Sequence, residues 1–129
     1  MWLPWSIFVM ITAIHLLFLA LSWRDVKRNA ETRKVVSNAE IIEKAIGSIL
    51  GVSPEMLRMR TRKRQIVEAR QMAMYFYRAK TPHSLSKIGR LLGNYDHATV
   101  VHACKTVGNL VETNAEFREK FQRVKSEIN

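Results

Sequence analysis

The amino-acid sequence predicts an all-α protein, in which a small helical bundle follows a single apolar helix. Apolar residues recur at helical spacing in successive segments after residue 37, and no segment alternates apolar and polar residues as a strand does. Residues 1–23 carry no Asp, Glu, Lys or Arg. With 129 residues and no internal repeat, the chain is long enough for one small core.

The apolar N-terminus predicts a transmembrane helix over residues 1–23. As a helix, the uncharged stretch from Trp2 to Trp23 would span roughly 33 Å, which is close to the hydrocarbon thickness of a bilayer. Trp2 and Trp5 at one end and Trp23 at the other suit the two membrane interfaces. An alternative stays open, in which an upstream start codon or an added extension supplies this tract to an otherwise soluble domain.

The basic residues that follow the tract predict its orientation. They are Arg24, Lys27, Arg28, Arg33 and Lys34. Because the N-terminal side offers no basic side chain, the positive-inside rule places the C-terminal part in the cytoplasm, with the N-terminus outside an inner membrane. The same lack argues against a cleaved secretory signal.

Residues 24–37 are polar and charged, and they are interpreted as a linker or a helical extension before a domain over residues 38–129. Asn38 is expected to cap a helix whose apolar face runs from Ile41 to Leu50, and Gly51 is expected to end it. Ser53 followed by Pro54 predicts a new N-cap and a short helix that leads into a basic run.

Four further helices are expected: residues 65–80, residues 84–92 before Gly93, a helix capped by Asp96, and a final amphipathic helix over residues 115–127. In the helix after Asp96, the inner face is expected to hold Val100, Ala103, Val107, Leu110 and Val111. The outer face is then left with Ala98, Val101, His102 and Lys105.

The formal charge of +10 falls entirely on residues 24–129, so this part is expected to meet an anionic partner, either nucleic acid or an anionic membrane surface. The single cysteine, Cys104, has no disulfide partner within the chain and is interpreted as a small core residue. No metal or cofactor is expected, because the spacing of His97, His102 and Cys104 does not bring three ligands onto one helical face.

One region combines a basic run, a tight turn and a polar helix start. Five of the seven residues from Arg58 to Arg64 are Lys or Arg, and the turn Gly93-Asn94-Tyr95 precedes Asp96-His97-Ala98-Thr99. This order is typical of a helix-turn-helix that enters the major groove of DNA.

The segments Glu68-Ala69-Arg70-Gln71-Met72-Ala73 and Asp96-His97-Ala98-Thr99-Val100-Val101-His102-Ala103 are specific enough to name a family. Over roughly residues 38–125, the chain resembles the C-terminal DNA-binding domain of the bacterial replication initiator DnaA. The resemblance implies double-stranded DNA as the partner and places Arg62 in the minor groove, which a delocalised guanidinium suits.

The resemblance also implies the contacts. Base contacts are expected from Arg62, Asp96, His97, Ala98 and Val101. DNA backbone contacts are expected from Arg60, Lys63, Arg64, Arg70, Gln71, Ser84, Lys87, Thr99 and Lys105. The chain departs from the family pattern Gly-Gly-Arg-Asp-His-Thr-Thr-Val at Asn94, Tyr95 and Ala98. Tyr95 replaces an arginine and Ala98 a threonine, so affinity or base preference is expected to differ.

These observations favour a sequence-specific double-stranded DNA-binding protein that regulates replication initiation or transcription. The alternative is a basic membrane-associated adaptor that binds a protein partner and anionic lipid. An enzyme is not expected, since the sequence has no Gly-x4-Gly-Lys-Ser/Thr loop, no paired catalytic carboxylates and no nucleophile with its base.

Overall fold

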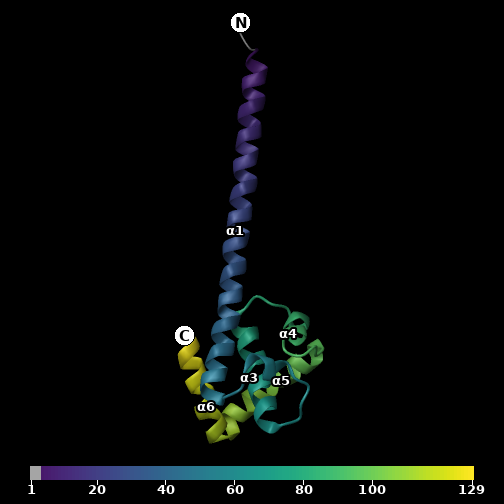
Figure 1. Cartoon of the computed structure of the whole chain (residues 1–129), viewed down its shortest axis with the longest axis vertical. Helices are drawn as coiled ribbons and strands as arrows, with labels where there is room; N and C mark the ends of the chain where they lie inside the picture. Colours follow the sequence, from purple (N-terminus) through teal and green to yellow (C-terminus); the bar gives the residue numbers. More distant parts are fainter. Residues whose placement is uncertain (1–3) are drawn as a thin grey trace. The chain divides into compact units, whose positions relative to one another are not determined.

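The computed structural model describes residues 4–129, apart from the side chain of Ser37, and these residues form six helices and no strand (Figure 1). The helices are α1 (Trp5–Leu50), α2 (Pro54–Arg58), α3 (Arg64–Lys80), α4 (Leu85–Leu91), α5 (His97–Thr113) and α6 (Ala115–Ile128). The all-α expectation is confirmed for the described residues.

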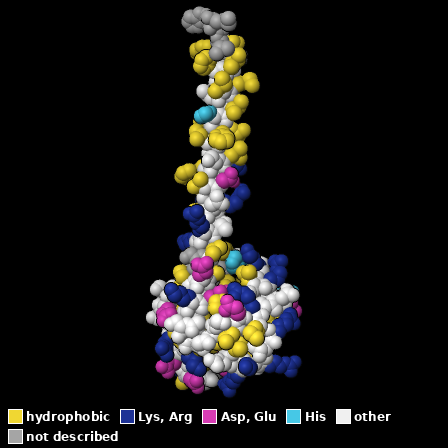
Figure 2. Space-filling view, viewed as in Figure 1, with side chains coloured by type: hydrophobic (Ala, Val, Ile, Leu, Met, Phe, Trp, Pro, Cys, Tyr) yellow, Lys and Arg dark blue, Asp and Glu magenta, His cyan; other side chains and the backbone are white. Residues whose placement is uncertain are grey.

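The chain divides into two units, Met1–Lys34 and Val35–Asn129, and the division falls within α1. In the first unit, the described apolar side chains are exposed, as Figure 2 shows for the yellow side chains along the apolar part of α1. By length and composition, α1 is the one helix of the described residues that is apolar enough to cross a membrane. Trp2, expected at one membrane interface, lies outside the described residues.

Asn38 does not begin a helix, which corrects one expectation. The chain has no proline or glycine between Trp5 and Ile46, so nothing interrupts α1 there, and residues 24–37 are helical as well. Asn38 instead uses its side-chain amide to donate a 3.2 Å hydrogen bond to the carbonyl of Lys80 at the end of α3. It therefore ties two helices together.

The other helix starts lie close to the positions that the sequence predicts. Ser53, Ser84 and Asp96 each cap a helix by accepting a hydrogen bond from the backbone N–H three residues later, and Asn114 does the same for α6. Gly51 follows the last residue of α1 with φ of 69°, a conformation that favours glycine.

The core of Val35–Asn129 is built around α3, which packs against α2, α4 and α5, while α6 packs on α5. Ile42 and Ile46 bring the last turns of α1 into this core. Phe76 of α3 stacks on Phe121 of α6 with ring centroids 5.0 Å apart. Cys104 is buried among these residues, as predicted.

Candidate nucleic-acid interface

The basic segment, defined as residues 58–64, connects α2 to α3 and is mostly exposed. Its first residue, Arg58, pairs with Glu43 of α1 at 2.7 Å. Arg62 is exposed, and among the described residues it has no hydrogen-bond or ion-pair partner. A free, exposed guanidinium is available to an external anion.

The turn between α4 and α5 adopts a conformation that its sequence explains. Gly93 has φ of 124° and Asn94 has φ of 60°, and glycine and asparagine are the residues that most readily adopt such values. The backbone N–H of Tyr95 then donates a 2.9 Å hydrogen bond back to the carbonyl of Gly89. Helix α4, this turn and α5 form the predicted helix-turn-helix.

Helix α5 divides into a buried and an outer face, as the sequence predicts. Val100, Ala103 and Val107 are buried, and Leu110 and Val111 are partly buried. The outer side chains of this helix are more accessible: His97, Ala98, His102 and Lys105 are exposed, and Val101 is half-buried. The spacing of residues 97, 98, 101 and 105 places them on one side of the helix.

Asp96 and Thr99 are engaged with each other at the start of α5. Oδ1 of Asp96 accepts hydrogen bonds from the backbone N–H of Thr99 at 2.9 Å and from its hydroxyl at 2.7 Å. The hydroxyl bond, followed by the backbone bond, lowers the pKa of the Asp96 carboxyl. Since a hydroxyl has a single proton, Thr99 can donate to a phosphate only by giving up its bond to Asp96.

Arg60 ties the basic segment to the turn before α5. Its guanidinium donates to the carbonyls of Asn94 at 2.7 Å and Gly93 at 3.4 Å, and its Cζ lies 5.0 Å from the centroid of the Tyr95 ring. The basic segment is therefore joined to the turn that precedes α5.

Arg70 lies differently from a typical phosphate contact. Its side chain is 5% exposed, Nε donates a 2.7 Å hydrogen bond to the carbonyl of Leu57, and Nη2 donates to the carbonyl of Met59. Its Cζ also lies 5.2 Å from the Tyr95 ring centroid. The guanidinium holds the chain that leads from α2 into the basic segment, and it is turned toward protein rather than solvent.

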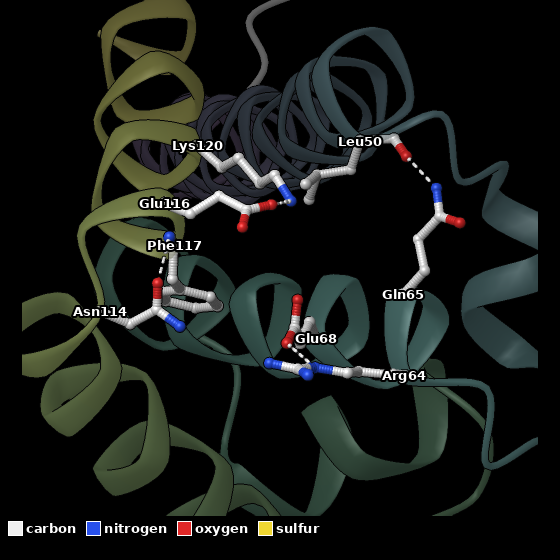
Figure 3. A network of polar contacts seen from close by, with 8 residues as sticks. All are labelled: Leu50, Arg64, Gln65, Glu68, Asn114, Glu116, Phe117 and Lys120. Carbon is white, nitrogen blue, oxygen red and sulfur yellow. Dashed lines mark hydrogen bonds and ion pairs between the residues drawn. The ribbon is translucent and has the colours of Figure 1, made fainter.

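The remaining predicted backbone contacts are more accessible. Gln71 is half-buried, and the residues Lys63, Arg64, Ser84, Lys87, Thr99 and Lys105 are exposed. Arg64 pairs with Glu68 one turn along α3 at 2.9 Å, as Figure 3 shows. In the same view the side-chain amide of Gln65 donates to the carbonyl of Leu50, so the start of α3 is fastened to the end of α1. The Ser84 hydroxyl caps α4 by accepting a hydrogen bond from the backbone N–H of Lys87.

Two features of this region were not predicted from the sequence. Tyr95 contacts both Arg60 and Arg70, and Glu43 accepts hydrogen bonds from Arg58 and from the hydroxyl of Tyr77. Each joins residues far apart in the chain, so periodicity carries no signal for them. Within residues 4–129, no group of three or more His, Cys, Asp or Glu side chains is placed to hold a metal ion.

Comparison with known proteins places this region among DNA-binding domains. The family described as "Bacterial dnaA protein helix-turn-helix" matches residues 39–107. The chain is similar to the chromosomal replication initiator protein DnaA of Flavobacterium psychrophilum, with 41% identity over 101 residues that cover 78% of this chain and 21% of the relative.

Two other relatives that match the chain are DnaA proteins as well. The DnaA protein of Porphyromonas gingivalis is 37% identical over 105 residues, covering 81% of this chain and 22% of the relative. That of Bacteroides thetaiotaomicron is 49% identical over 67 residues, covering 52% and 14%. The chain thus spans about a fifth of the length of the first of these relatives.

Proposed function

Because this chain belongs to the family of bacterial DnaA helix-turn-helix domains, we propose that it binds double-stranded DNA sequence-specifically at DnaA-type boxes and so regulates replication initiation or transcription. The matched family is a DNA-binding domain and carries no catalytic module. The other activities of the full-length relatives are not proposed for this chain.

The observation that carries the proposal is the bond from Arg60 to the carbonyl of Asn94, because it joins the two elements that would meet DNA. The outer side of α5 would lie in the major groove, with His97, Ala98 and Val101 toward base edges. Arg62, free of partners within the described residues, would enter the adjacent minor groove.

The polar and charged residues divide into base contacts and backbone contacts. Asp96 would reach a base edge with the carboxylate oxygen that does not cap α5. Lys63, Lys87 and Lys105 would contact phosphates, and so would Arg60, Arg64, Gln71, Ser84 and Thr99. Such contacts fix the register of the protein on the duplex without reading sequence. Arg70 would act indirectly, by holding the basic segment.

The test is a mobility-shift titration of a duplex with a DnaA box against a scrambled duplex of equal length, at one salt concentration. We expect the box to bind at least about a hundredfold more tightly. His97→Ala should weaken binding to the box by about tenfold and leave binding to the scrambled duplex unchanged. Lys63→Gln is the matched comparison, because loss of a phosphate contact weakens both alike. Equal affinity of the unaltered protein for the two duplexes would exclude specific binding.

We further propose that residues 1–23 anchor this domain to the inner membrane, with the C-terminal part in the cytoplasm. Support comes from the exposed apolar side chains of α1, from Trp5 and Trp23, and from the basic residues that follow. In cell fractionation with alkaline carbonate washing, the chain should stay with the membrane pellet. The double variant Ile14→Arg, Leu17→Arg should enter the supernatant, since each charge costs about 3 kcal/mol at the centre of a span. Recovery of the unaltered chain in the supernatant would exclude the anchor.

A further inference from the structure

Tyr95 occupies a fixed position between α4 and α5. Its N–H donates to the carbonyl of Gly89, and a Cβ built on Gly89 would lie 2.1 Å from the carbonyl oxygen of Tyr95. The backbone at residue 95 therefore rests directly on α4, and α5 begins two residues later at His97. A side chain at this position keeps a constant place relative to the recognition helix.

The ring of Tyr95 contacts the residues that shape the basic segment. The guanidinium carbons of Arg60 and Arg70 lie 5.0 Å and 5.2 Å from the ring centroid, within the range of cation–π attraction. Arg60 belongs to the basic segment, and Arg70 holds the carbonyl of Leu57, just before the segment, and that of Met59 within it.

The packing around this ring is close. A Cβ on Gly93 would lie 2.8 Å from Cε2 of Tyr95 and 3.0 Å from the carbonyl oxygen of Arg58. The ring, the turn and the first residue of the basic segment therefore meet at Gly93, with no space for another side-chain atom. The tyrosine ring is half-buried at this junction.

From these contacts we propose that Tyr95 is a positioning residue that fixes the basic segment, and with it Arg62, relative to α5 before DNA binds. The inference rests on the proposed DNA-binding function. An aromatic ring attracts both guanidinium groups through its negative face, whereas an arginine at this position would add a third cation beside them. Compared with the arginine of the family pattern, Tyr95 removes one cation that could contact phosphate. In exchange, it orders the basic segment, which carries Arg62 to the minor groove.

The contacts of Arg60 also affect how Arg62 meets DNA. Because Arg62 lies two residues after Arg60, holding Arg60 in place restricts where Arg62 can reach. If the segment is already in place, binding loses less conformational entropy and the minor-groove contact contributes more of the affinity. Loss of the ring should therefore weaken the minor-groove contribution selectively, and leave readout by α5 in place.

The experiment uses the full chain in detergent micelles and three duplexes: a DnaA box, the same box with 2,6-diaminopurine in place of adenine, and a scrambled sequence. Diaminopurine adds an amino group in the minor groove and leaves the major-groove edge of the base pair unchanged. The readout is the ratio of Kd for the modified box to Kd for the ordinary box. This ratio reports the minor-groove contact and is insensitive to a uniform loss of folded protein.

We expect a ratio of about ten for the unaltered protein and for Tyr95→Phe, which keeps the ring. Tyr95→Leu and Tyr95→Arg should lower the ratio to about two, because the segment is no longer held. Arg60→Gln, which removes the cation from the ring and the guanidinium bonds to the turn but keeps Tyr95, should lower it in the same way. If Tyr95→Leu fails to fold, as judged by helical circular dichroism, the Arg60→Gln variant tests the positioning role by itself.

Other outcomes overturn the proposal in distinguishable ways. A ratio that stays near ten in Tyr95→Leu and in Arg60→Gln would show that the ring does not position Arg62, while box specificity itself stands. A ratio of one for the unaltered protein would remove the minor-groove contact and the positioning role with it. Equal affinity of the unaltered protein for the box and the scrambled duplex would instead remove the DNA-binding function on which the proposal rests.

Discussion

Nε of Arg70 donates a 2.7 Å hydrogen bond to the carbonyl of Leu57, so this arginine of α3 is part of the protein interior. Replacement by methionine keeps an unbranched apolar stem, shorter than arginine, and removes every donor. The carbonyls of Leu57 and Met59 would lose charge-assisted hydrogen bonds, and we expect the free energy of unfolding to fall by roughly 3 kcal/mol.

Denaturation of the Arg70→Met variant can be followed through the tyrosines of the bundle. All three tyrosines lie in Val35–Asn129, while all three tryptophans lie in residues 1–23. The near-ultraviolet circular dichroism of tyrosine therefore reports on the bundle. Arg70→Lys should recover only part of the loss, because an ammonium group cannot reproduce the planar fork. An unchanged denaturation midpoint for Arg70→Met would contradict the structural role.

Arg62→Ala should weaken binding to the box duplex by about thirtyfold, since an exposed guanidinium without an internal partner loses only its contact with DNA. Arg123→Ala on α6 is the matched control, because it removes the same charge from another exposed site. Binding of both variants to vesicles with anionic lipid should be alike. A membrane adaptor would instead show equal, small effects of both variants on DNA, and such a result would favour that alternative.

Asp96→Ala should lower the melting temperature of the bundle by a few degrees, because α5 loses its N-cap. Asp96→Asn is the control, since asparagine caps a helix about as well as aspartate. If Asp96 also reads a base, the asparagine variant should keep its stability and change its base preference in a binding-site selection. An unchanged preference would limit Asp96 to capping.

The same cap predicts a dependence on acidity. Hydrogen bonds from Thr99 hold the pKa of Asp96 below its ordinary value of 3.8, so the folded state favours the carboxylate. The stability that this group adds is present above pH 3.8 and is lost as the pH falls through the lowered pKa. Relative to Asp96→Asn, which has no carboxyl to protonate, the unaltered protein should lose stability in that range. A difference that is constant down to full protonation would show that the carboxylate is not favoured by folding.

Much of this fold is predictable because its signals are local. The caps at Ser53, Ser84 and Asp96 join atoms three residues apart, and the inner face of α5 follows from helical period. The outer positions of Ala98 and Lys105 follow from the same period. The identity of the expected contacts came instead from the family resemblance, and their roles on DNA stay predictions.

The features of the fold and of the site that the sequence does not predict depend on contacts between distant parts of the chain. Arg70 was expected at a phosphate because the family resemblance implied that contact, but carbonyls 11 and 13 residues earlier hold it inside. Asn38 was expected to cap a helix, but its side-chain amide bonds instead to the carbonyl of Lys80, 42 residues further along the chain. Sequence spacing carries no information on such pairs.

Tyr77→Phe should lower the free energy of unfolding by about 1 kcal/mol, because the tyrosine hydroxyl donates a 2.7 Å hydrogen bond to Glu43 in a largely buried setting. Burial first, and then this hydrogen bond, raise the pKa of Tyr77 above its ordinary value of 10.0. The folded state therefore keeps a proton that the unfolded state loses, and the stabilisation declines as the pH rises beyond 10.0. The phenylalanine variant should lack this decline, which urea titrations at pH 9 to 11, roughly spanning that value, would reveal.

Two glycines on neighbouring helices should respond to alanine in opposite directions. At Gly89 of α4 a Cβ would lie 2.1 Å from the carbonyl oxygen of Tyr95, and backbone cannot yield as a flexible side chain does, so Gly89→Ala should cost about 3 kcal/mol. At Gly108 of α5 a Cβ would meet nothing within 4 Å, so Gly108→Ala should add about 1 kcal/mol through helix propensity. Because the Gly89 contact sets where the turn rests on α4, its loss should also lower the discrimination between box and scrambled duplex at temperatures where the variant is still folded. Equal stability of the two variants would mean that α4 does not support the turn in the way that the structure shows.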